Sequence, residues 1–285
     1  MSIYRTLEVV PCSGALGAEI LGVDLSDELS EDTFEEIHRA FVDHQVIFFR
    51  SQHLTPEQHK QFGRRFGPLI VHPYLEGIPG HPEIMLIKKE KHERHNFANA
   101  WHTDSSYHAA PALGSMLYAI DVPTVGGDTL FTNMYLAYET LSAGMRTLLG
   151  RLRARHTFSG SQGLGGHGRE QDLDYASDAL EDDGSIHESV THPVVRTHPE
   201  TGRGALYVNG MFTVCFENMT EEESAPLLQY LCRHAIRPEF TCRFRWEKGS
   251  VAFWDNRCTM HYPVNDYQGQ FRLMHRVTVG GDRPF

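Results

Sequence analysis

The sequence predicts a β fold of two sheets with a few covering helices, and two observations support this prediction. The first is a series of short runs rich in β-branched and aromatic residues, separated by Gly and Pro, which is typical of strands joined by turns. The expected strands are 46–50, 115–120, 128–132, 192–198, 205–209, 242–246, 251–255 and 271–279. This pattern alone does not distinguish a jelly roll from another sandwich.

The second observation is that helix start signals are few. A Ser or Thr stands before three apolar-periodic segments, and in two of them a Gln or Glu follows three residues later, which is a capping box. The expected helices and their N-caps are 29–44 with Ser30, 54–67 with Thr55, and 220–235 with Thr220. A further helix is expected at 134–150.

Composition and charge narrow the class of protein. The 285 residues show no linker or repeat, so we expect one domain over 1–285. The net charge of −11, without a basic block, argues against a nucleic-acid partner. No apolar run approaches the roughly 20 residues of a membrane-spanning helix, and the five Cys form no CxxC pair. We therefore expect a cytoplasmic protein with reduced thiols and no membrane partner.

One long loop region is expected near 160–189. Its first part, GSQGLGGHGRE, lacks the Lys-Ser/Thr ending of a phosphate-binding loop, and its second part, LEDDGSIHES, is acidic. Long loops on β scaffolds often carry function, so the region is either a lid over a pocket or a surface connection.

The stretch FANAWHTDSSYH contains a candidate metal site. His102 and Asp104 are two residues apart, and in a strand such residues point to the same face. A surface pair of His and Asp is the alternative. His261 in WDNRCTMH, after a strand and a turn, offers a third ligand. Two His and one carboxylate leave coordination positions open, which suits Fe(II) working with O2, whereas a structural zinc site is closed.

An Arg and a Thr in nearby segments fit a cosubstrate. Arg272 lies in the strand after His261, and a guanidinium suits the distal carboxylate of 2-oxoglutarate through charge-assisted hydrogen bonds. Thr129, in GGDTLFT, could add a hydroxyl donor; alternatively it is a β-branched strand residue after a Gly-Gly turn.

Taken together, the segments WHTD, GGDT, WDNRCTMH and FRLMHR resemble the taurine/2,4-D (TauD/TfdA) family of Fe(II)/2-oxoglutarate dioxygenases. The likeness runs from GALGAEILGVDLS at 14–26 to HRVTVGGDRPF at the C-terminus. It implies a double-stranded β-helix, a variety of jelly roll, and a homo-oligomer, either dimer or tetramer.

The resemblance also implies roles for particular residues. His102, Asp104 and His261 match the iron ligands, and Thr129 and Arg272 match the groups that bind 2-oxoglutarate. Because related halogenases lack the carboxylate ligand, Asp104 favours oxygenation with O2 over halogenation.

Further matches concern the primary substrate. Arg276 matches an Arg that receives the sulfonate in taurine enzymes, His72 resembles a His that contacts it, and Phe158 could contact the rest of the molecule. A structural salt bridge, a loop His and a core Phe are the respective alternatives.

Two departures from the taurine enzymes point to a larger or less polar substrate. Leu75 and Ala98 stand where those enzymes have polar residues. The expected substrate is therefore a small anionic organic molecule, with sulfonate, sulfate ester and aryloxyalkanoate all open, hydroxylated and possibly cleaved next to the heteroatom. The competing hypothesis is a jelly-roll metalloprotein without oxygenase turnover, either an isomerase or hydrolase or a binding module, which would have no reason to keep Arg272 with Thr129.

Overall fold

The computed structural model describes residues 4–72, 77–96, 98–158 and 189–285. Apart from Ser189, the expected lid segment 160–189 lies outside the described residues, as does Leu75. The strands are β1 (Glu8–Pro11), β2 (Ala18–Leu21), β3 (Val46–Phe49), β4 (Leu69–Ile70), β5 (Gly77–Ile78), β6 (His81–Lys89), β7 (Gly114–Asp121), β8 (Thr129–Asn133), β9 (Arg153–Thr157), β10 (Ser189–Pro193), β11 (Val195–Thr197), β12 (Gly204–Leu206), β13 (Thr213–Phe216), β14 (Thr241–Phe244), β15 (Val251–Asp255), β16 (Thr259–Pro263) and β17 (Arg272–Val279).

The helices begin where the capping residues predict. They are α1 (Glu31–His44), α2 (Pro56–Arg64), α3 (Met134–Glu139), α4 (Ala143–Leu149), α6 (Glu221–Ala235) and the short 3-10 turn η2 (Pro238–Phe240). Ser30, Thr55 and Thr220 are the N-caps of α1, α2 and α6, and the last two form complete capping boxes. None of the helices in the described ranges is long and apolar enough to cross a membrane.

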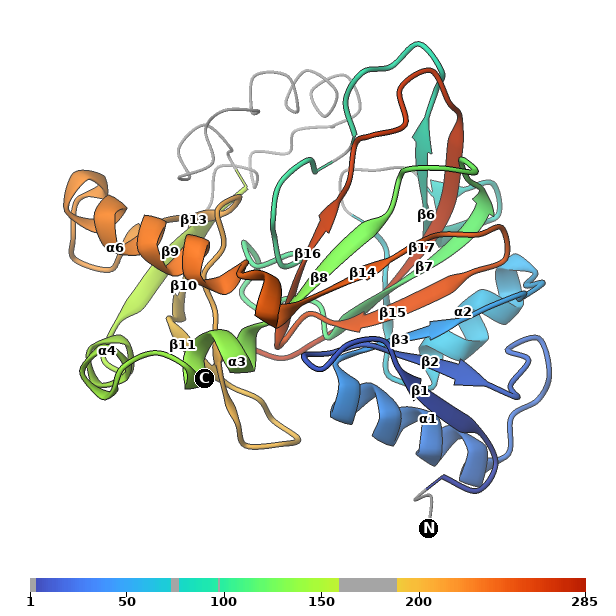
Figure 1. Cartoon of the computed structure of the whole chain (residues 1–285), viewed down its shortest axis with the longest axis horizontal. Coiled ribbons are helices and arrows are strands. Elements are labelled where there is room, and N and C mark those ends of the chain that lie inside the picture. The colour runs from blue at the N-terminus through green and yellow to red at the C-terminus, as the bar shows by residue number, and fades with distance from the viewer. Residues whose placement is uncertain (1–3, 73–76, 97, 159–188) are drawn as a thin grey trace.

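Two sheets face each other across one core (Figure 1). The larger sheet has the order β1-β2-β3-β15-β7-β17-β6-β5, with β4 beside β17, and the smaller one has the order β14-β8-β16. All pairs in these two sheets are antiparallel except β2 with β3. Two facing antiparallel sheets of this kind form a jelly roll, as predicted.

The strand β3 shows how the sequence produces two layers of core. Alternate side chains of a strand point to opposite faces, and all four residues of β3 are buried. Val46 and Phe48 pack between the two sheets, whereas Ile47 and Phe49 pack on the outer face, in the cluster that also contains residues of α1 and α2. A strand covered on both faces therefore reads as the continuous apolar run VIFF.

Two expectations about element boundaries are wrong. The segment 134–150 forms two helices, because the Ser142 side chain accepts a hydrogen bond from Met145 N and starts α4 as a new helix. The segment 192–198 is divided between β10 and β11, which pair with different strands. The helices α3, α4 and α6 and the strands around β9 bury a third apolar cluster beside the two sheets.

Candidate active site

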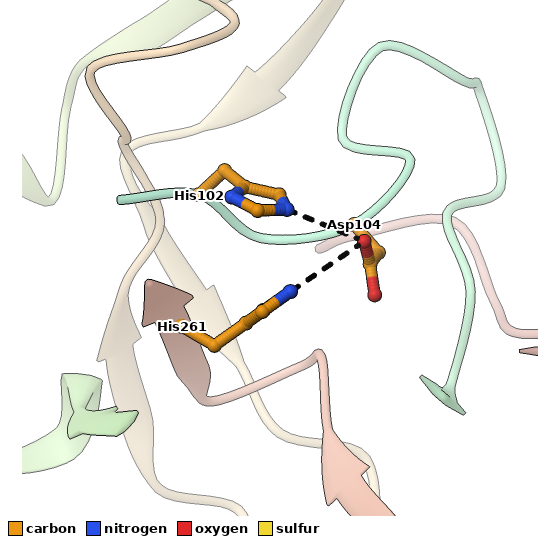
Figure 2. A group of neighbouring side chains, drawn as sticks. All are labelled: His102, Asp104 and His261. Atoms are coloured by element: carbon orange, nitrogen blue, oxygen red, sulfur yellow. Dashed lines mark ion pairs between the residues drawn. The ribbon is translucent and has the colours of Figure 1, made fainter. Parts of the chain in front are cut away.

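The first metal-ligand candidates come together through the smaller sheet. His102 follows β6 and makes a single antiparallel bridge with His261 of β16, through backbone hydrogen bonds of 3.1 and 2.9 Å. Asp104 lies just beyond, at the start of a turn in which Ser105 has φ 58°. The expectation that His102 and Asp104 share one strand face is therefore wrong. Asp104 lies in a turn, and this turn directs its carboxylate toward the two imidazoles (Figure 2).

The three side chains point toward one another (Figure 2). His102 Nε2 lies 3.6 Å and His261 Nε2 lies 4.0 Å from Asp104 Oδ1. These distances are too long for hydrogen bonds. They are short enough for the three atoms to surround a common point, and one donor atom from each residue lies within 4.8 Å of the others.

Asp104 is buried but charged. Its Oδ2 accepts a hydrogen bond from Ser115 Oγ at 2.8 Å, and Arg276 Nη2 lies 3.1 Å from its Oδ1. Burial alone would raise the pKa of Asp104, but the charge of Arg276, followed by the influence of His261 and His102, holds that pKa well below its usual range. Asp104 is thus ionised at neutral pH.

The surroundings of the two imidazoles are suited to binding a cation. Ala100 O lies 2.8 Å from His102 Nδ1, so the proton sits on Nδ1 and leaves the lone pair on Nε2. Burial, followed by the proximity of His102, lowers the pKa of His261 well below its usual range. Two imidazoles and one carboxylate, all buried, therefore fit the donor set of a non-haem iron site.

Arg272 and Thr129 meet in the pocket that contains this site. Both line it, together with His102 and His261. Arg272 is buried and its Nε has no hydrogen-bond partner among the described residues. Burying the Arg272 guanidinium without an acidic partner costs free energy, so this part of the pocket is suited to bind an anion.

Trp246 orients Thr129, and sequence reasoning missed it. The indole N–H of Trp246 donates to Thr129 Oγ1 at 2.9 Å. An indole nitrogen cannot accept, so the Thr129 hydroxyl receives this bond and keeps its own proton for another acceptor. The expected donor role of Thr129 is therefore chemically available.

Arg276 lies on the same face of β17 as Arg272, as the i and i+4 spacing predicts. Both are buried and line the pocket, whereas Leu273 and His275, at the alternate positions between them, are only partly buried. His72 lies near Arg276: burial, followed by the charge of Arg276, lowers the pKa of His72 to about 4. His72 is therefore neutral at pH 7.

Phe158 belongs to an aromatic group next to His102. The Phe158 ring lies 4.8 Å from Tyr107 and 6.2 Å from Phe212, and the Phe212 ring lies 6.2 Å from His102. Phe158 thus reaches the site through two aromatic residues that sequence reasoning missed. Ala98 lines the pocket itself, which places an apolar residue at one of the two departures from the taurine enzymes.

A jelly roll with two His and one carboxylate, together with Arg272 and Thr129 in the same pocket, is typical of non-haem Fe(II) oxygenases. The family "Taurine catabolism dioxygenase TauD, TfdA family" matches residues 8–278, and the chain belongs to this family.

Two sequence relatives and one solved structure show the same class. The chain is 38% identical to an alpha-ketoglutarate-dependent sulfate ester dioxygenase of Pseudomonas putida, over 98% of this chain and 91% of the relative. It is 35% identical to an alkylsulfatase of Acinetobacter baylyi, over 98% and 86%. A taurine dioxygenase structure from Burkholderia xenovorans superposes with a TM-score of 0.82 at 38% identity, over 98% and 91%. The protein is a 2-oxoglutarate-dependent dioxygenase.

Proposed function

We propose that His102, Asp104 and His261 hold Fe(II), that Arg272 and Thr129 bind 2-oxoglutarate, and that the protein hydroxylates a sulfate ester of a small organic alcohol. The observation that carries the substrate proposal is the position of Arg276. It is a buried cation that lines the pocket, and one of its amino groups lies 3.1 Å from Asp104. An anionic head group bound by Arg276 would therefore lie beside the metal ligands.

The neighbouring residues favour an organic tail that is not strongly polar. The aromatic group of Tyr107, Phe158 and Phe212 lies on the His102 side of the site, and Ala98 lines the pocket. His72 is neutral, so it can contact an anion as a hydrogen-bond donor without adding charge. Among the relatives, those from Pseudomonas putida and Acinetobacter baylyi are named for sulfate esters.

The proposed reaction is a hydroxylation at carbon followed by the loss of sulfate. O2 and 2-oxoglutarate are consumed, succinate and CO2 are formed, and a C–H bond next to the ester oxygen becomes C–OH. The C–O bond of this product then breaks, which gives an aldehyde or ketone and releases sulfate. Bound Fe(II) would supply the activation of O2.

The chain's own residues would position the reactants. Arg272 would hold the distal carboxylate of 2-oxoglutarate, and Thr129, with its proton kept free by Trp246, would donate a hydrogen bond to it. Arg276 would hold the sulfate, and burial would strengthen both contacts because water is largely excluded.

The test is a substrate panel with anaerobically prepared Fe(II) enzyme, 2-oxoglutarate and O2. The panel contains alkyl sulfates of four to eight carbons, matching alkanesulfonates, taurine and aryloxypropionates, with the His102→Ala variant as the blank. We expect succinate and sulfate in equal amounts with alkyl sulfates. Preference for the sulfonates or aryloxypropionates would contradict the substrate proposal, and sulfate release without 2-oxoglutarate would indicate a hydrolase.

A further inference from the structure

The strap of residues 264–271 joins β16 to β17 and borders the pocket. Of its eight residues, only Tyr267 is buried, with 2% of its surface exposed, and Tyr267 lines the pocket together with Arg272 and Thr129.

The Tyr267 ring lies directly beside Arg272. A Cβ atom added to Gly127 would meet Tyr267 Cδ1 at 3.2 Å and Arg272 Nε at 3.6 Å, so the ring edge and the guanidinium flank the same point. The turn that carries Gly127 leads straight into Thr129. The ring therefore lies near Arg272, and it lines the same pocket as Thr129, the other residue that we assign to 2-oxoglutarate.

Two contacts fix the ring in this position. Its hydroxyl donates to Asn96 Oδ1 at 2.7 Å, and the Lys89 ammonium lies 4.2 Å from the ring centroid. Lys89 is the direct partner of Arg272 in the pairing of β6 with β17, and it is buried as well. A ring held at its hydroxyl and on its face cannot swing aside without losing both contacts.

The strap is also tied to the turn before β8. Gly127 N donates to Asp266 Oδ1 at 2.7 Å, and Val264 N donates to Asp128 O at 2.9 Å. Gly126 has φ +85°, and a Cβ there would lie 2.7 Å from Asp266 Oδ1, so only glycine allows this approach. Lys89 Nζ further donates to Asn265 Oδ1 at 3.2 Å.

We propose that Tyr267 is the end wall of the cosubstrate part of the pocket and sets the length of the 2-oxo acid that the enzyme accepts. The proposal rests on the proposed function, because it takes Arg272 to be the receptor of the distal carboxylate. A diacid that is one methylene longer, 2-oxoadipate, has to push its carboxylate past Arg272 and into the fixed ring. Tyr267 is thus a specificity-determining residue for the cosubstrate.

The experiment compares 2-oxoglutarate with 2-oxoadipate in wild type, Tyr267→Ala and Tyr267→Phe. Dissociation constants come from calorimetry with the Fe(II) enzyme under anaerobic conditions, and kcat/KM comes from turnover with the primary substrate. We expect Tyr267→Ala to shift the ratio of the two acids toward 2-oxoadipate by about 10-fold, since one methylene at a pocket wall is worth roughly that much. Tyr267→Phe keeps the ring and its contact with Lys89 but loses the bond to Asn96, so it should shift the ratio much less than Tyr267→Ala.

The control is Gln270→Ala, which removes another contact of the strap, from Gln270 Nε2 to Val125 O, at a residue that does not line the pocket. It should leave the ratio unchanged. If Tyr267→Ala weakens both acids equally, Tyr267 is only structural and the proposal is wrong. If that variant does not fold, Tyr267→Leu is measured by the same criterion. Failure of the wild type to bind either acid, or unchanged 2-oxoglutarate binding in Arg272→Ala, would instead contradict the proposed function.

Discussion

The described part of the chain contains two buried groups of potential metal ligands that include His and Asp, and they differ in how the protein pairs their polar atoms. The site group consists of His102, Asp104 and His261, and the second group consists of His198, Asp255 and Cys258. In each group the potential ligand atoms lie within 4.8 Å of one another. By proximity and residue type alone, both could hold a metal.

In the second group, the protein itself satisfies every oxygen and nitrogen. Asp255 accepts from Arg257 Nε at 2.8 Å and from Arg257 Nη2 at 2.7 Å, and His198 Nε2 lies 3.0 Å from its Oδ2. His198 Nδ1 accepts from the backbone N–H groups of residues 200 and 201. Burial raises the pKa of Cys258 well above its usual range, so its sulfur stays a thiol and is a poor ligand.

In the site group, Asp104 is paired with Ser115 and Arg276, but the two imidazoles each keep a nitrogen atom that forms no hydrogen bond with the residues that the structure describes. His102 Nε2 and His261 Nε2 reach no hydrogen-bond partner at ordinary distance in the described part of the chain, and both residues line a pocket. The difference teaches that a buried His–Asp group indicates a metal site only when its lone pairs are not already used. The second group stabilises the turn before β16 through the hydrogen bonds of Asp255 to His198 and Arg257.

The largest expected contrast comes from removing the two carboxylates. Asp104→Ala should reduce succinate formation to the level of the His102→Ala blank, because one of the three ligands is gone. Asp255→Ala should instead lower the free energy of unfolding by about 3 kcal/mol, because the buried Arg257 loses its buried charged partner and keeps only the partly exposed Glu200. Chemical denaturation and the turnover assay measure both variants. Full turnover in Asp104→Ala would refute the ligand assignment.

The two arginines of β17 should separate cosubstrate from substrate. Arg272→Ala should weaken 2-oxoglutarate binding by at least about 2 kcal/mol, or roughly 30-fold, since it removes a buried charge partner. Arg276→Ala should raise the KM for the sulfate ester more than that for 2-oxoglutarate. Steady-state kinetics with each compound varied in turn checks both, and the reverse pattern would mean that the two roles are exchanged.

A smaller effect is expected from Trp246→Phe, which keeps the aromatic ring but removes the N–H that orients Thr129. One hydrogen bond contributes about 1 kcal/mol, so affinity for 2-oxoglutarate should fall about 5-fold. Thr129→Val is the matched variant, and combining the two should cost little more than Thr129→Val alone. Additive losses in the double variant would show that Trp246 does not act through Thr129.

The smallest expected effect is on the pH dependence of stability, through Glu200 beside the second group. Glu200 accepts from His38 and pairs with Arg257, and these contacts, against the opposing effect of partial burial, lower the pKa of Glu200 to about 2. Because the unfolded value is about 4.3, the stability from Glu200 is complete above that pH and is lost as the pH falls toward 2.

Glu200→Gln should therefore flatten the loss of stability between about pH 4.5 and 2, by at most about 1 kcal/mol because Glu200 is partly exposed. Urea denaturation across this range measures it, with Glu222→Gln on the exposed side of α6 as the control. An equal effect of both substitutions would contradict the contribution of Glu200 to the pH dependence of stability.

Much of the fold could be predicted from local signals. The capping boxes at Thr55 and Thr220 place their helix starts correctly because each box is a short-range hydrogen-bond pattern. The strand β9, with the sequence RARHT, was not predicted, because its buried positions are Ala154 and His156, which give no apolar alternation, and its partners come from residues far along the chain. Strands of this kind depend on tertiary packing more than on propensity.

Some residues of the candidate site could be predicted from the sequence and others could not. His102, Asp104, His261 and Arg272 belong to short motifs and could be predicted with the help of the family resemblance. Trp246 and Tyr267 could not, because their roles depend on contacts that join β14, β8 and the strap across the pocket. A Gly-Gly turn followed by Thr was the one available signal that another segment approaches closely there.

The most direct test of the central contrast is the iron content of the protein after anaerobic loading with Fe(II) and removal of unbound metal. We predict one iron per chain in the wild type and in Cys258→Ser, and almost none in His102→Ala. Iron retained by His102→Ala but lost from Cys258→Ser would place the metal in the second group and contradict the account.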